Sequence, residues 1–145
     1  MRLGIRKIEW ISASSLQDYS AIAPGVSVNI DAFVKEGKSF SELPFTPDTA
    51  SVDEEWVDDG NGQYSKVSLS ASIRKDRMQY SSLLARLTGR KTIWKVTLID
   101  GNVYIIGSPE YLPKLTYSNS ISGYSSSEFA VSIQCESKHG MLLCE

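Results

Sequence analysis

Histidine and cysteine are scarce in this chain of 145 residues, which has one histidine, His139, and two cysteines, Cys135 and Cys144. A single histidine argues against a Ser-His-Asp triad and against a metal site with several histidine ligands. Two cysteines are too few for a disulfide scaffold, although a bridge between them is still possible. A reducing cytoplasm at synthesis is the compartment that this cysteine usage favours.

Long hydrophobic runs and a strong excess of one charge are also missing. No apolar stretch approaches the length of about 18 residues that a membrane-spanning helix needs, and the charged N-terminus is neither a signal nor a transit peptide. A net charge of −2 gives no general attraction to nucleic acid. With 41% hydrophobic and 22% charged residues, the chain is typical of one soluble globular domain spanning residues 1–145.

Motifs for phosphate binding and for an activated nucleophile are absent, and two possible metal sites have no recognised pattern. Cys135, His139 and Cys144 with Glu136 could supply four zinc ligands, but the spacing C-x3-H-x4-C is not a known zinc motif. The acidic run that ends at residues 58–62 lacks the spaced ligands of a calcium loop. We therefore predict no enzyme, no metal and no cofactor.

What the chain does contain is the period-two alternation of half-buried β-strands. Residues 64–75 show it best, because an apolar row that includes Val67 and Leu69 alternates with a row of serines and charged residues. Asn61-Gly62 and Asp100-Gly101 are typical hairpin turns. Further strands are expected at residues 2–12, with either a bulge near Gly4 or Arg6 or burial on both faces. Others are expected at 26–34, 51–59, 91–99, 103–106, 112–121 and 128–136, with a short strand or tail at 139–145.

One helix is expected, from Asp76 to Thr88. Asp76 and Gln79 have the spacing of a capping box, and Gly89 stands where a glycine commonly ends a helix. The apolar stripe at helical spacing consists of Tyr80, Leu83, Leu84 and Leu87. The predicted fold class is mainly β: an antiparallel β-sandwich or barrel of about eight strands, with one short α-helix over an opening or an edge.

Three segments are candidate surfaces for contacts between subunits. Residues 35–50 are irregular, as in a partner-binding arm or in a surface loop that buries its own hydrophobic side chains. The 51–59 arm is acidic and the helix is flanked by basic residues, so these patches could meet across subunits, pair within one subunit, or not meet. The candidate subunit-contact residues are Phe40, Leu43 and Phe45 of the loop, Asp53, Glu54, Glu55, Asp58 and Asp59 of the hairpin, and Arg74, Lys75, Arg77, Arg86 and Arg90 around the helix.

The basic residues around the helix could also contact phosphate, but aromatic side chains for stacking on bases are sparse there. Only Tyr80 and Trp94 are near in the sequence. We therefore expect no sequence-specific contact with nucleic acid, and a solvated helix surface explains the same charges.

The arrangement of Tyr64 to Ile106, with the loop at 35–50 and the acidic hairpin closing at Gly60 to Gly62, resembles that of small phage and prophage tail or head–tail proteins, such as tube, terminator and completion proteins. The resemblance is architectural and covers about half of the chain. It implies a structural subunit that forms a ring or tube with copies of itself and contacts other tail proteins. It implies no catalytic residue, and a place in the virion after synthesis in the cytoplasm.

The alternative interpretation is a ligand-binding β-domain for carbohydrate or another small polar molecule. It depends on exposed aromatic side chains, on which sugar rings could stack. The candidates for such a platform are Trp56, Tyr104, Tyr111, Tyr117 and Tyr124.

Overall fold

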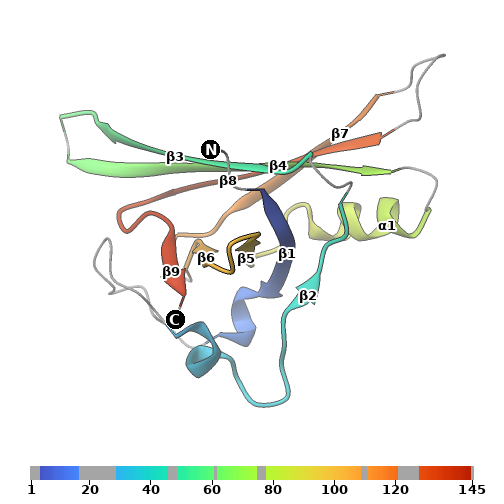
Figure 1. The fold of residues 1–145 in the computed structure, drawn as a ribbon, viewed down its shortest axis with the longest axis horizontal. Coiled ribbons are helices and arrows are strands. Elements are labelled where there is room, and N and C mark those ends of the chain that lie inside the picture. Colours follow the sequence, from blue (N-terminus) through green and yellow to red (C-terminus); the bar gives the residue numbers. More distant parts are fainter. Residues whose placement is uncertain are drawn as a thin grey trace.

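The computed structural model describes residues 4–16, 29–45, 49–60, 62–74, 78–108, 111–120 and 128–144. They form two antiparallel sheets and one α-helix (Figure 1). The five-stranded sheet has the order β2-β1-β5-β6-β9, and the four-stranded sheet has the order β3-β4-β8-β7. The elements are β1 (Ile5–Ser12), β2 (Ser41–Glu42), β3 (Ser51–Asp58), β4 (Gln63–Arg74), α1 (Met78–Leu87), β5 (Thr92–Leu98), β6 (Val103–Ile106), β7 (Lys114–Ser120), β8 (Glu128–Ser137) and β9 (Leu142–Cys144). The predicted fold class is confirmed, with nine strands in the described part of the chain.

The two sheets lie face to face, and the four-stranded sheet is the longer layer (Figure 1). At one end of the molecule the hairpin of β3 and β4 extends beyond the five-stranded sheet. At the other end α1 lies beneath the four-stranded sheet and inserts Leu84 and Leu87 into the main core. The helix therefore covers one opening between the sheets, as the sequence predicts.

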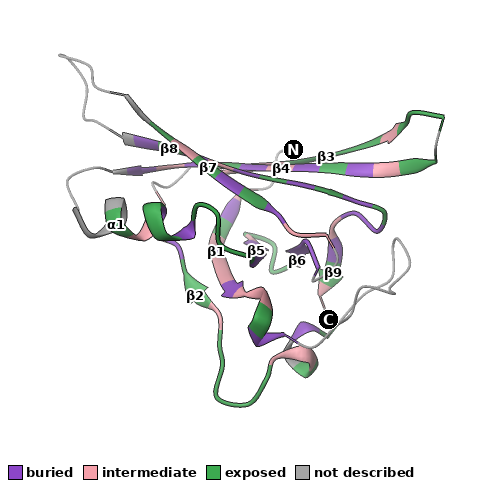
Figure 2. Ribbon diagram, turned by 180° about the vertical axis from the view of Figure 1, so that it is seen from behind, coloured by how far each residue is buried: buried purple, intermediate pink, exposed green. Residues whose placement is uncertain are grey.

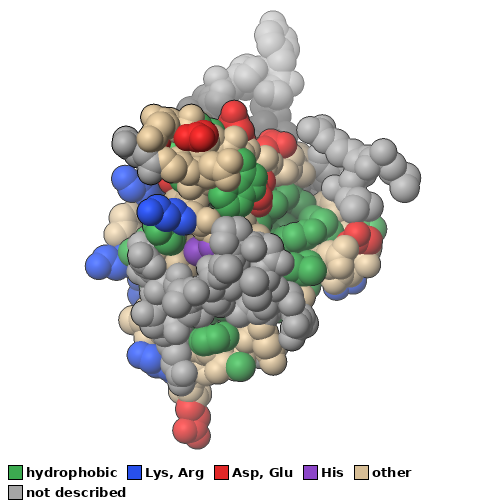
Figure 3. Space-filling model, turned by 90° about the vertical axis from the view of Figure 1, so that its left-hand side faces the viewer, with side chains coloured by type: hydrophobic (Ala, Val, Ile, Leu, Met, Phe, Trp, Pro, Cys, Tyr) green, Lys and Arg blue, Asp and Glu red, His purple; other side chains and the backbone are tan. Residues whose placement is uncertain are grey.

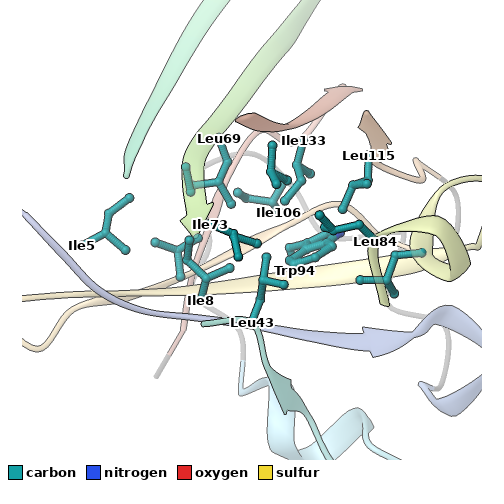
Figure 4. Packing of buried hydrophobic residues seen from close by; sticks show 14 of the residues in the cluster. Ile5, Ile8, Leu43, Leu69, Ile73, Leu84, Trp94, Ile106, Leu115 and Ile133 are labelled. Atoms are coloured by element: carbon teal, nitrogen blue, oxygen red, sulfur yellow. The ribbon is translucent and has the colours of Figure 1, made fainter. Parts of the chain in front are cut away.

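The main core lies between the sheets and follows the alternation read from the sequence. Trp94 on β5 is fully buried and packs with side chains of both sheets and of α1 (Figure 4). Figure 2 shows buried and exposed residues alternating along β4 and β8. The buried rows are Val67, Leu69, Ala71 and Ile73 on β4, and Phe129, Val131, Ile133 and Cys135 on β8.

A second hydrophobic cluster explains why β5 and β6 are apolar on both faces. Trp94 and Ile106 belong to the main core, whereas the neighbouring residues Ile93 and Ile105 belong to the second cluster. Two short 3-10 helices, Ala13–Ser15 and Ile30–Phe33, lie in the segments that contribute to this cluster. The five-stranded sheet is therefore covered on both sides.

The strand predicted at residues 26–34 is wrong for its described part. Residues Ile30–Phe33 form a 3-10 helix, and only Val34 makes an isolated β-bridge, with Leu16. The amide of Ala32 donates to the carbonyl of Asn29 at 3.1 Å, a turn that asparagine favours. Residues 26–28 lie outside the described residues.

Other local predictions can be compared with the structure in the same way. The predicted bulge is present, because the register of β1 against β5 shifts between Ile5 and Lys7. Gly89 follows α1 with φ of 83°, as expected of a helix-ending glycine. The irregular loop at 35–50 does contain one regular element, since β2 pairs with β1 through Trp10 and Ser41. The predicted cap at Asp76 lies outside the described residues.

Within the described part of the chain, none of the helical segments has the length and apolar character to cross a membrane.

Candidate functional site

The hydrophobic side chains of the long loop pack against the chain's own cores. Leu43 is 1% exposed in the main core, and its amide donates to the carbonyl of Ile8 at 2.8 Å. Phe40 and Phe45 are half-buried, and Lys95 Nζ lies 4.4 Å from the centre of the Phe40 ring. Leu43 is therefore not available to a neighbouring subunit in this conformation, and this arrangement matches the alternative of a loop ordered by its own hydrophobic residues.

The acidic residues of the hairpin lie on an exposed edge strand. Asp53, Glu54, Glu55 and Asp58 are all exposed on β3, which pairs only with β4 among the described strands. Asp53 and Glu55 stand opposite Ser68 and Lys66, so they share the face of the sheet that points away from the core. Asp59 follows the strand and is also exposed.

Glu54 accepts two hydrogen bonds on the inner face of the hairpin. Its Oε1 accepts a hydrogen bond from Trp56 Nε1 at 2.7 Å, and its Oε2 accepts one from the amide of Met141 at 3.0 Å. The Trp56 ring lies against Gly140, where an added Cβ would be 2.9 Å from Cζ2. These contacts tie the hairpin to the turn before β9, so Glu54 is already engaged within the subunit.

The described basic side chains of the candidate set are those of Arg86 and Arg90, at the C-terminal end of α1. Arg86 is on α1 and Arg90 follows it, and both are exposed without an ion-pair partner in the described chain. Figure 1 shows the turn and α1 at the two ends of the long axis. Among the described residues neither arginine forms an ion pair with Asp53, Glu54, Glu55 or Asp58. The side chain of Arg74 and the whole of Lys75 and Arg77 lie outside the described residues.

Figure 3 views the end that carries the β3–β4 turn. Acidic side chains gather at the top, over the hairpin, and basic side chains lie on one flank below it. Among the described residues, ion pairs join Glu9 to Lys7 and to Lys95, each at 3.8 Å, and neither pair includes Asp53, Glu54, Glu55 or Asp58. These four carboxylates therefore give the hairpin a negative surface.

His139 is buried in a polar network and is 3% exposed. Its Nδ1 lies 2.6 Å from the carbonyl oxygen of Gly140 and its Nε2 lies 3.1 Å from Ser108 Oγ. Because a carbonyl only accepts, Nδ1 carries the proton in the neutral ring and Nε2 accepts from the serine hydroxyl. The ring of Tyr111 packs edge-on against the imidazole, with ring centres 5.6 Å apart.

This contact has the geometry of a nucleophile and its base, but Ser108 is 0% exposed and no substrate can reach it. We assign the pair a structural role, which holds the segment before Tyr111 against the turn before β9. Sequence reasoning missed the pair because Ser108 and His139 are 31 residues apart and belong to no motif.

The three residues considered as zinc ligands do not converge. Cys135 lies in the main core, Cys144 packs against the second cluster, and His139 bonds to Ser108 and Gly140. In the part of the chain that the structure describes, no group of three His, Cys, Asp or Glu residues could hold a metal ion. Neither cysteine is part of a disulfide.

Burial raises the pKa of the Cys135 thiol from 9.0 to about 12, and the neighbouring charge of Glu136 adds to the effect. The thiolate is the reactive form, so folded Cys135 is inert near neutral pH. Between pH 9.0 and about 12 the unfolded thiol loses its proton while the folded thiol keeps it. The free energy of unfolding therefore falls as pH rises through this range.

We expect one thiol per native chain to react quickly with a thiol-disulfide reagent such as DTNB at pH 8. That thiol is Cys144, which is half-buried on β9, and Cys135 should react only after unfolding in guanidinium chloride. The matched variant Cys144→Ser should show no fast phase in the native state. Two fast thiols in the native wild-type protein would contradict the placement of Cys135.

The aromatic residues of the alternative interpretation do not form one platform. Tyr117 packs edge-on against Phe129, with ring centres 5.9 Å apart, whereas Tyr111 packs against His139. These two tyrosines line different hollows. Trp56 is 43% exposed on the inner face of the hairpin, Tyr104 is half-buried on β6, and Tyr124 lies outside the described residues.

The outer face of the four-stranded sheet carries rows of polar side chains that strand register brings together. One row places Lys66 between Glu55 and Glu136, and the next contains Asp53, Ser68, Gln134 and Lys114. Further rows, which are mostly hydroxyl-bearing, consist of Ser51, Ser70, Ser132 and Thr116, then Ser72, Ala130 and Ser118. A groove of about 600 Å³ lies over the charged rows and one of about 490 Å³ over the hydroxyl rows.

Comparison of the chain with protein-family models, curated proteins and solved structures finds no match in any of the three.

Proposed function

We propose that the protein is a non-enzymatic structural subunit that assembles with copies of itself, in the manner of phage or prophage tail components. The observation that carries the proposal is the contrast between the two open edges of the four-stranded sheet. β3 presents Asp53, Glu55 and Asp58, whereas the described part of β7 presents Lys114 and no acid. Open edges with main-chain groups free to pair are common sites of strand addition.

The topology favours pairing of β3 with β7 of a neighbouring copy. In a sheet of four antiparallel strands, the two edge strands β3 and β7 run in opposite directions. If a second copy in the same orientation is placed beside the first, its β3 is therefore antiparallel to β7 of the first copy and can extend the sheet. Pairing of β3 with β3 would bring two acidic strands side by side, which like-charge repulsion disfavours. A contact between different edges forms a ring when the rotation closes and a filament when it does not.

The charge distribution along the strands supports stacking of such rings. The acidic β3–β4 turn lies at one end of the long axis, and α1, with the exposed Arg86 in its last turn, lies toward the other (Figure 1). Stacked layers can therefore place the turn of one layer against the α1 side of the next, where opposite charges attract. In this arrangement the hairpin and the helix flanks of the candidate set serve contacts between subunits, while Leu43 serves the core.

A charge-swap complementation experiment tests the edge contact. Asp53→Lys with Glu55→Lys makes the β3 edge basic, and Thr116→Glu with Ser118→Glu makes the β7 edge acidic; all four side chains are exposed. Each double variant alone should associate about tenfold or more weakly, because its two edges then carry like charge. A mixture in equal amounts should recover wild-type association, measured by sedimentation velocity at one fixed total concentration.

The matched control is Glu36→Lys with Glu42→Lys, which changes the net charge by the same amount on exposed positions away from both edges. It should associate like the wild-type protein. The edge contact is refuted if both edge variants assemble as well as the control, or if the mixture stays monomeric.

A further inference from the structure

The groove over the charged rows of the outer face has features of a ligand site. It holds about 600 Å³ and spans β3, β4, β8 and the start of β7. We refer to it as the outer-face groove. Its charged and amide side chains are Asp53, Glu55, Lys66, Lys114, Gln134 and Glu136.

These polar groups are not used up by contacts with one another. Lys66 stands in register between Glu55 and Glu136, yet none of the ion pairs seen among the described residues involves them. The Lys66 ammonium instead lies 5.8 Å from the centre of the Tyr64 ring. The groove therefore offers several donors and acceptors that a ligand can engage without first breaking an internal salt bridge.

The lining selects against anionic ligands. Three carboxylates against two ammonium groups give the groove a net charge of −1, which disfavours polyphosphates and nucleic acids. Its lining also includes Ser68, Leu112 and the strands at Val67 and Cys135, whose side chains are buried in the main core. Carboxylate, amide and ammonium groups side by side can accept from and donate to the many hydroxyls of a sugar.

Two further hollows are lined in part by residues of β4 and β8. One of about 480 Å³ shares Glu136 with the outer-face groove and is lined by Tyr64 and Tyr111, whose rings can pack on the apolar face of a sugar. The other, of about 490 Å³, is lined by hydroxyl-bearing side chains such as Ser70 and Thr116. Because the first hollow adjoins the groove at Glu136, the two together offer room for a chain of more than one sugar unit.

We propose that the outer-face groove binds a neutral oligosaccharide, which lies across the charged rows. The groove shares Asp53, Glu55 and Lys114 with the edge contact proposed above, whereas Lys66 and Gln134 lie on the central strands β4 and β8. Substitution of Lys66 or Gln134 therefore separates loss of sugar binding from loss of self-association.

The test is titration of the isotope-labelled full chain with maltohexaose, cellohexaose and chitohexaose, followed by two-dimensional amide NMR spectra. At least one of the three should bind with a dissociation constant below about 1 mM, and shifted amides should map to the outer-face strands. Lys66→Ala and Gln134→Ala, both at exposed positions, should each weaken binding about tenfold through loss of a hydrogen-bonding group. Glu42→Gln, on the other sheet, is the matched control and should bind like the wild-type protein.

The proposal is overturned if none of the three oligosaccharides binds below 10 mM, or if the shifts map to another surface. It is equally overturned if Lys66→Ala and Gln134→Ala bind as tightly as Glu42→Gln. Binding of the sulfated polymer heparin in place of the neutral oligosaccharides would also contradict it, because that result would assign the groove to polyanions.

Discussion

Replacement of Trp94 by alanine should lower the free energy of unfolding by about 3–5 kcal/mol, as expected for truncation of a large buried side chain. Trp94 is 0% exposed and belongs to the cluster that joins both sheets with α1 (Figure 4). Its Nε1 donates to Thr92 Oγ1 at 3.0 Å, and the variant leaves that buried hydroxyl without its donor. Urea denaturation followed by circular dichroism measures the change.

Ile99→Ala is the control, because Ile99 is 63% exposed and its truncation should change stability by less than about 0.5 kcal/mol. Trp94→Phe is a milder second variant, which keeps an aromatic ring in the core and should show an intermediate loss. Equal stability of Trp94→Ala and Ile99→Ala would show that Trp94 is not at the centre of the core.

Gly107→Ala should destabilise the protein by about 2–4 kcal/mol through backbone strain and overpacking. Gly107 has φ of 93°, and a Cβ there would lie 2.5 Å from Pro113 Cδ and 3.1 Å from the carbonyl oxygen of Tyr111. Neither the proline ring nor the main chain can move aside as a flexible side chain would. The measurement is again the free energy of unfolding in urea.

Gly37→Ala separates the two causes. Gly37 also has a positive φ, 78°, but a Cβ there meets nothing within 4 Å. It should therefore lose only the conformational contribution, about 1 kcal/mol. If the two variants were equally destabilised, the close approach of Pro113 to Gly107 would carry no energetic weight.

Local patterns in the sequence predicted most of the strands. The alternation along residues 64–75 and 128–136 became the two central strands of the four-stranded sheet, with the apolar rows buried. The Asp-Gly signal at residue 100 joined β5 to β6. These features depend on side-chain period and turn chemistry, which act over a few residues and can be read from them directly.

The features that the sequence did not predict are decided by distant contacts. The alternation around Ile30 predicts a strand, but Ile30–Phe33 forms a 3-10 helix. Ile30 is buried in the second cluster, where its partners come from β1, β5 and β6. β2 is only a pair of residues, and it exists because β1 offers an edge for Trp10 and Ser41 to pair. The order of strands in each sheet likewise depends on pairings that no local pattern encodes.

The residues of the candidate site likewise divide into those that local sequence predicts and those that only distant contacts bring together. The sequence identified the acidic hairpin, but only the register shows that Asp53 and Glu55 face the groove while Glu54 ties the hairpin to Met141. The groove itself was missed, because Gln134 and Lys114 meet Lys66 and Asp53 only after four strands align. The sequence around Leu43 does not indicate whether its side chain packs in the core of its own subunit or against a neighbouring subunit.

Self-association through the unlike edges β3 and β7 is tested most directly by the mass of the wild-type protein in solution. Light scattering coupled to size-exclusion chromatography should be run over a concentration series from about 1 µM to about 1 mM, spanning weak to moderate affinities. We predict that the mass rises with concentration through species larger than a dimer, and that added salt lowers it because the acidic β3 edge contributes to the contact. A protein that stays monomeric at the highest concentration, or that stops at a dimer, would contradict the account.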